Sequence, residues 1–129
     1  MSWIDDTLRD FGQQMGLPQL EFGRHKVAQL AFDSGAVLAV EPSQRGEVEE
    51  VLVYLSQPLG FGAERSIRQA LIKAHHSNLG QMPVQVATRG NGPDTALLAL
   101  VRIPARNFTL QSLDESFDYL KRWHASLEG

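Results

Sequence analysis

Apolar residues near the N-terminus recur every three or four positions. They are Ile4, Leu8, Phe11 and Met15. This spacing places them on one face of a helix. Ser2 is suited to cap its first turn, and Gly16 is suited to end it before a proline-containing segment. The opening residues therefore predict an amphipathic helix that buries one side.

The chain then changes to the alternating spacing that is typical of strands. In residues 27–32, Ala28, Leu30 and Phe32 alternate with other side chains. Residues 36–40 predict a second strand, and the Asp-Ser-Gly turn at 33–35 lies between the two. A polar loop is expected over 42–46. The β-branched and aromatic residues of 47–56 predict a third strand.

Helical spacing returns over 63–79. Ile67, Leu71 and Ala74 share one stripe of this predicted helix, and Gly80 stands just past its expected end. The segment therefore predicts a second amphipathic helix.

Two more strands and a last helix complete the pattern. The strands are expected over 84–88 and 95–103, the second being followed by a proline. The last helix begins at Thr109 or at Ser112, and in the second case Ser112-x-x-Glu115 fits a capping box.

The order of the elements is α-β-β-β-α-β-β-α. It predicts an α+β fold in which helices pack a mostly antiparallel, twisted sheet, and the length of 129 residues suits one domain over 1–129. Strands 47–56 and 95–103 are apolar on both faces, although three short helices cannot readily cover both faces of a small sheet. Either the chain buries both faces itself or a partner covers one of them.

Composition narrows the class of protein. The chain is 43% hydrophobic and 21% charged, which is typical of a folded soluble domain. The formal net charge is -3 and the 12 Lys and Arg are scattered, so the basic footprint of a nucleic-acid-binding protein is missing. There is no cysteine, no signal-peptide pattern and no run near the ~18 apolar residues of a membrane span. We expect a cytoplasmic protein without nucleic-acid partners or membrane insertion.

The histidines are the strongest candidates for metal binding or acid–base catalysis, but their spacing does not favour a metal site. His75 and His76 are adjacent, so on a helix their side chains point about 100° apart. His124 and Glu128 have i,i+4 spacing, and we interpret them as a pair on a helix surface. We expect no metal, no cofactor and no catalytic residues. A small enzyme or ligand-binding domain that uses these histidines is the alternative.

Several segments carry a likeness to a known family. They are residues 1–4, 15–20, 33–35, 68–76 and 112–123. Together with the element order, the small size and the acidic charge, they resemble the class I type III secretion chaperones, the Tir-chaperone family. Within it the chain is most similar to the SycN-type gatekeeper chaperone subunit. The glycine-rich connection over 89–94 is longer than that pattern suggests.

The resemblance implies a dimeric virulence chaperone in the bacterial cytoplasm, and it is compatible with a peripheral position at the secretion apparatus. Such a chaperone binds the N-terminal region of a secreted client, here the gatekeeper (plug) protein. It keeps this client soluble, partly unfolded and secretion-competent without ATP. The second subunit would be another small chaperone or a second copy of this chain. A homodimeric effector chaperone and a regulatory chaperone that binds an anti-activator are alternatives.

The resemblance also implies two sets of site residues. In this family the second helix and the strand after it build the dimer interface, which here corresponds to Ile67, Ala70, Leu71, Ala74, Val84 and Val86. Apolar client residues would fill grooves formed by the first helix and the sheet, and a client strand can add to a sheet edge. The expected client contacts are Leu8, Phe11, Leu30, Phe32 and Leu38. Packing in the chain's own core is the alternative for all five.

Overall fold

The computed structural model describes residues 3–17, 20–23, 26–59, 63–77, 83–90 and 95–126. Some sequence-based expectations fall outside these residues. They concern Ser2, Gly80, Glu128, most of the glycine-rich connection and the side chains of His75 and His76.

The described part of the chain has three α-helices, one short 3₁₀ helix and five strands. They are α1 (Trp3–Gln14), β1 (Ala28–Ala31), β2 (Val37–Arg45), β3 (Val48–Pro58), α2 (Ala63–Ser77), β4 (Gln85–Arg89), β5 (Ala96–Pro104), η2 (Ala105–Asn107) and α3 (Leu110–Ala125). The predicted order of helices and strands is confirmed.

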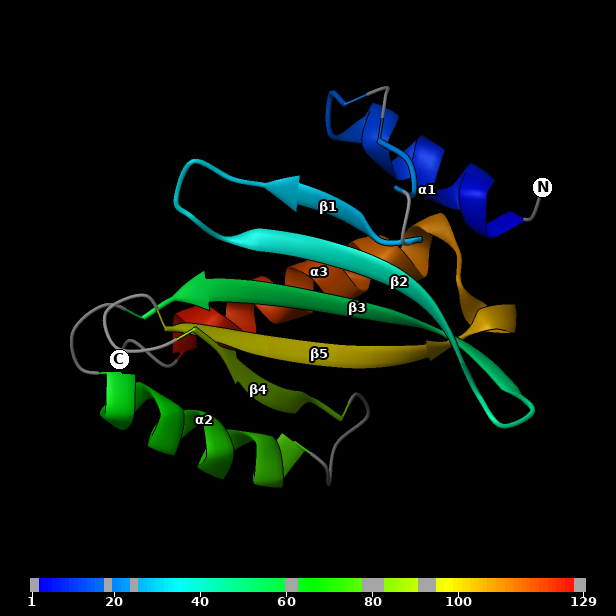
Figure 1. The fold of residues 1–129 in the computed structure, drawn as a ribbon. Coiled ribbons are helices and arrows are strands. Elements are labelled where there is room, and N and C mark those ends of the chain that lie inside the picture. The colour runs from blue at the N-terminus through cyan, green and yellow to red at the C-terminus, as the bar shows by residue number, and fades with distance from the viewer. Residues whose placement is uncertain are drawn as a thin grey trace.

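The strands form a single sheet with the order β1-β2-β3-β5-β4 (Figure 1). All four neighbouring pairs are antiparallel. The turn predicted at 33–35 is confirmed: Gly35 has φ +93°, and Phe32 and Ala36 are hydrogen-bonded across it. The predicted α+β fold with an antiparallel sheet is therefore confirmed.

The hydrophobic core lies between one face of the sheet and helices α1 and α3. Alternate residues of β3 and β5 point into it, and the helices contribute large side chains from the other side. Its fully buried large residues include Val51, Val53, Leu55, Leu97, Val101, Leu8, Phe11, Leu113 and Leu120. In Figure 1 the strands pass in front of α3, while α1 lies beside β1 and α2 beside β4.

The opposite face of the sheet is also apolar. Leu52 and Tyr54 of β3 and Leu98 and Leu100 of β5 are half-buried there, and Tyr54 pairs directly with Leu100. Figure 1 shows none of the described helices in front of this face. The described part of the chain therefore buries one face of its sheet and leaves the other available to a partner.

The prediction of a polar loop over 42–46 was wrong. β2 continues to Arg45, and only Gly46 and Glu47 turn the chain toward β3. Pro42 has no N–H to donate to a neighbouring strand. It is tolerated within β2 because β1 pairs only with the first four residues of β2, so the proline lies on an open edge.

The last helix begins at the first of its two predicted starts. Thr109 is the N-cap: its N–H donates to Ser112 Oγ (2.8 Å), and the N–H of Ser112 donates to Thr109 Oγ1 (3.0 Å). The box predicted from Ser112 to Glu115 was wrong, since Glu115 instead accepts a bond from Gln111 (2.9 Å).

The interpretation of His124 as a surface residue was also wrong. It is only 5% exposed, and its Nε2 lies 2.8 Å from the backbone oxygen of Leu55. Because a carbonyl oxygen can only accept, Nε2 carries the donated hydrogen. The ring therefore attaches the end of α3 to the middle of the sheet.

Candidate functional site

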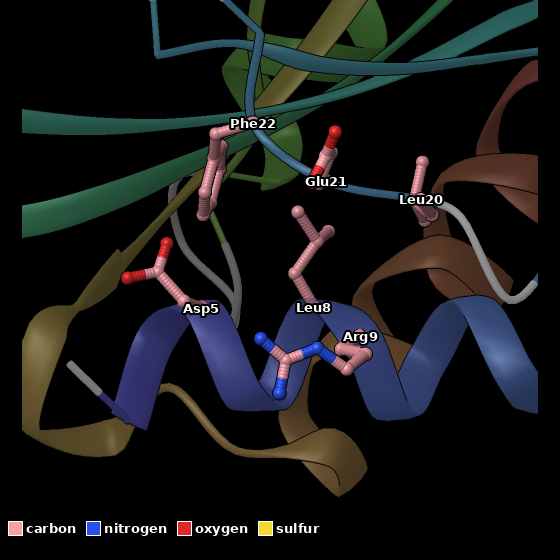
Figure 2. A pocket seen from close by; sticks show the side chains of 6 residues that line it. All are labelled: Asp5, Leu8, Arg9, Leu20, Glu21 and Phe22. Atoms are coloured by element: carbon pink, nitrogen blue, oxygen red, sulfur yellow. The ribbon is translucent and has the colours of Figure 1, made fainter. Parts of the chain in front are cut away.

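A hollow of about 200 Å³ lies between α1 and the segment 20–22. Its lining is Asp5, Leu8 and Arg9 from α1 and Leu20, Glu21 and Phe22 from the segment. In Figure 2, Leu8 and Asp5 project from the helix toward the segment, and Phe22 projects back toward the helix. The hollow thus combines three apolar side chains with three charged ones.

Two glycines let the chain fold back along α1. Gly16 turns the chain after the helix with φ +79°, a conformation that other residues rarely adopt. The N–H of Leu17 then donates to the backbone oxygen of Gly12 (2.6 Å). A Cβ at Gly12 would lie 2.5 Å from the oxygen of Leu17 and 2.7 Å from Cβ of Leu20. The wall of the hollow therefore depends on glycine at position 12.

Gly12→Ala is expected to push residues 17–20 away from α1, because the clash involves backbone as well as side chain. The expected loss in the free energy of unfolding is about 1–3 kcal/mol, the range for overpacking. Denaturant unfolding measures it, and hydrogen exchange of the segment locates it. Gly23→Ala is the matched control, since its Cβ would meet only an ordinary contact at 3.5 Å. Equal stability of the two variants would contradict the close approach at Gly12.

The charged side chains around the hollow can exchange their ion-pair partners at little energetic cost. Arg9 pairs with Asp6 at 3.3 Å across one helical turn, and both side chains are at least half-exposed. Exposed pairs of this kind contribute less than about 1 kcal/mol, so a binding partner can replace them at little cost.

The residues predicted as client contacts belong mainly to the core. Leu8, Phe11 and Leu38 are buried, and Leu30 and Phe32 are partly buried against them. Of the five, Leu8 also lines the hollow. A client-contact role for these residues stays a prediction.

Leu20 and Phe22 line the hollow but carry no periodic signal in the sequence. They follow a turn and lie outside any helix or strand. Their position is set by contact with α1, which no local pattern reveals.

The residues predicted for the dimer interface differ in how deeply they are buried. Ala70, Ala74 and Val84 are buried within the chain, and Ile67 and Val86 are partly buried. Leu71 is 57% exposed, and its neighbour Ile72, which was not predicted, is 56% exposed. A dimer role for the six predicted residues stays a prediction.

Polar residues on the uncovered sheet face bond to one another. Glu50 accepts a bond from Arg102 (2.6 Å), which also donates to Gln85 (2.7 Å). The hydroxyl of Tyr54 donates to Glu41 (3.3 Å). Burial raises the pKa of Tyr54, and the negative charge of Glu41 raises it further.

The described residues contain no group of three or more His, Cys, Asp or Glu that could hold a metal ion. Among the described helices, none is long and apolar enough to cross a membrane.

The sequence matches the family model of the type III secretory system chaperone SycN over residues 3–127, which is nearly the whole chain. The chain belongs to this family. The resemblance to a SycN-type chaperone is thereby confirmed. No curated protein sequence matches this SycN-family chain.

Three solved structures share the fold of this SycN-family protein. One is the Yersinia pestis type III secretion chaperone SycH in complex with a stable fragment of YscM2, with TM-score 0.66, 16% identity and coverage of 96% of this chain and 98% of the other. The ExsC–ExsE complex gives TM-score 0.67, 20% identity and coverage of 97% of this chain and 93% of the other. The HopA1–SchA chaperone–effector complex gives TM-score 0.68, 16% identity and coverage of 95% of this chain and 90% of the other. These matches confirm the class I chaperone fold.

Proposed function

We propose that this SycN-family chaperone binds the disordered N-terminal segment of a secreted protein and keeps it partly unfolded without ATP. The hollow between α1 and segment 20–22 is the observation that carries the proposal. The similar structures support it, because one is a chaperone–effector complex and another holds a chaperone with a protein fragment. The gatekeeper protein of the secretion apparatus is the first candidate client.

The surface of α1 suits an extended client. Trp3 on the helix and Met15 and Leu17 just after it are exposed, so apolar side chains also lie at the surface near both ends of α1. Burying such surface contributes roughly 25 cal/mol per Å² and offsets the loss of conformational freedom in the client. Binding and release can therefore proceed by mass action alone.

A dimer would present two such surfaces. We infer that α2 and β4 provide its interface, since they lie at the sheet edge away from α1 (Figure 1). The second subunit is another small chaperone for a gatekeeper client, or a second copy for a homodimeric effector chaperone. The cytoplasm, where the client is synthesised, is the proposed location.

Affinity co-purification from the native bacterium, followed by mass spectrometry, tests this function. We expect a larger secreted protein together with a second small acidic protein. A secreted protein alone would favour the homodimeric effector chaperone. Recovery of metabolic enzymes only, under secretion-inducing conditions, would contradict the chaperone function.

The double variant Asp5→Lys, Arg9→Glu tests the hollow itself. It reverses two charges at the lining while the apolar core is unchanged. Client capture is expected to weaken by roughly tenfold, equal to about 1.4 kcal/mol. The control is Asp118→Lys, Arg122→Glu, which makes the same exchange of charges at an exposed ion pair on α3, and circular dichroism checks that both variants fold. Unchanged capture by the α1 variant would contradict a client site at the hollow.

A further inference from the structure

A second hollow, of about 210 Å³, lies between the end of β5 and the first turns of α3. We call it the β5 hollow. It shares no lining residue with the hollow at α1. Its lining combines apolar side chains with hydrogen-bonding groups, and includes Pro83, Ile103, Pro104, Asn107, Glu115 and Ser116.

The hydroxyl of Ser116 lies in this lining without a partner. Ser116 is fully buried, and its Oγ makes no hydrogen bond within the described part of the chain. A serine hydroxyl can donate one hydrogen bond and accept two. Burying it without a partner costs free energy, so the hydroxyl does not stabilise the folded chain. A ligand in the β5 hollow would supply the missing partner.

The backbone of β5 also has an open edge at the β5 hollow. β4 pairs with β5 only as far as Gln85. The N–H of Leu59 donates to the backbone oxygen of Thr95 (2.9 Å), and this register places the odd-numbered residues of β5 in hydrogen-bonded pairs with β3. The N–H and C=O of Arg102 therefore point toward the opposite edge. The residue that continues the β4 register there is Pro83, which has no N–H to donate. This edge suits an added strand.

The lining determines which side chain of such a strand would fit. A residue placed opposite Ile103 would point to the same sheet face as Ile103, which is buried on the side of α3. Its path would follow apolar side chains and end among hydrogen-bond acceptors, the carboxylate of Glu115 and the hydroxyl of Ser116. The guanidinium of Arg102 is already paired with Glu50 at 2.6 Å, so Glu115 leaves the lining acidic.

A lysine side chain matches this combination. Its aliphatic stem can pack against apolar walls, and its ammonium carries three donors and a positive charge. We propose that the β5 hollow binds a lysine side chain of an extended segment from another protein, and that this segment pairs with the open edge of β5 at Arg102. The inference goes beyond the proposed client site at α1 and does not depend on it.

The probe is the peptide acetyl-Thr-Val-Lys-Val-Thr-amide, whose β-branched residues favour an extended chain. The full-length, isotope-labelled protein is titrated with it, and the amide chemical shifts are followed by NMR. The amides of Arg102, Glu115 and Ser116 are expected to shift together. A peptide with norleucine in place of lysine keeps the stem but lacks the ammonium, and it is expected to bind at least about tenfold more weakly. N-methylation of both valines blocks strand pairing and is expected to cause a similar loss.

The variant Ser116→Ala is expected to have two opposite effects. The peptide should bind about fivefold more weakly, whereas the midpoint of denaturant unfolding should rise, because a buried hydroxyl without a partner is removed. Glu115→Gln is expected to weaken binding about threefold, as for an exposed ion pair. Asp114→Asn is the matched control, since it removes an exposed charge next to Glu115 but outside the lining, and it should leave binding unchanged.

Three results would each overturn the proposal. The first is a titration in which the amides of Arg102, Glu115 and Ser116 do not shift. The second is equally tight binding of the norleucine or the N-methylated peptide, since the site would then recognise neither the ammonium nor the strand. The third is a lower unfolding midpoint for Ser116→Ala, which would mean that the hydroxyl already has a partner in the folded chain. Client capture is not part of this titration, so the β5 hollow and the client site at α1 can fail separately.

Discussion

Phe11→Ala is expected to lower the free energy of unfolding by about 3–5 kcal/mol, the largest effect of any substitution considered for this chain. The side chain is fully buried. Its ring meets that of Phe117 edge to face, with 6.1 Å between centroids and an interplanar angle of 86°. Phe117 in turn stacks on Phe32, which directly follows β1, with 5.5 Å between ring centroids. The alanine therefore opens a cavity where α1, α3 and the end of β1 meet. Denaturant unfolding measures the loss.

The same variant separates two roles for Phe11. Core packing predicts a large loss of stability, and Phe11→Leu, which keeps most of the apolar volume, is expected to cost clearly less. A residue used mainly for client binding would behave differently. A Phe11→Ala protein with wild-type stability and weakened client capture would therefore contradict the core assignment.

Arg102→Met is expected to destabilise the fold by about 2–3 kcal/mol, because it leaves the carboxylate of Glu50 without its closest partner. Glu50 is 5% exposed and lies 2.6 Å from the guanidinium. Breaking a fully buried pair costs roughly 3–5 kcal/mol. The expected loss is smaller here, since the Arg102 side chain is 35% exposed and Arg45 lies 3.9 Å from the same carboxylate. Unfolding in denaturant at neutral pH gives the value.

A second substitution tests the physical cause. If the cost arises from an unpaired buried charge, replacing both residues in Glu50→Met, Arg102→Met should recover much of the stability, as for other buried pairs. If the double variant is as unstable as the sum of the two single variants, the loss would instead reflect packing of the arginine stem. Such additivity would contradict an ion-pair origin.

The proposed client site at the hollow between α1 and segment 20–22 illustrates what local sequence patterns cannot predict. The helical spacing of Leu8 and Phe11 correctly indicates an apolar side of α1, but it does not say whether that side faces the core or a groove. Both residues are buried, and the hollow is lined partly by Leu20 and Phe22, which have no periodic spacing. Their approach depends on the missing Cβ of Gly12, eight residues before Leu20.

By itself, the sequence determined the order of elements and the turn at 33–35, because periodicity and turn chemistry act over a few residues. The family followed instead from a resemblance that extends over nearly the whole chain. The tertiary structure decided which sheet face is covered, since β3 and β5 are apolar on both sides and alternation cannot distinguish them. It also decided that β2 runs through Pro42, which depends on where β1 stops pairing, and that His124 is buried against Leu55. Each of these depends on contacts between residues far apart in the chain, and such contacts leave no local pattern.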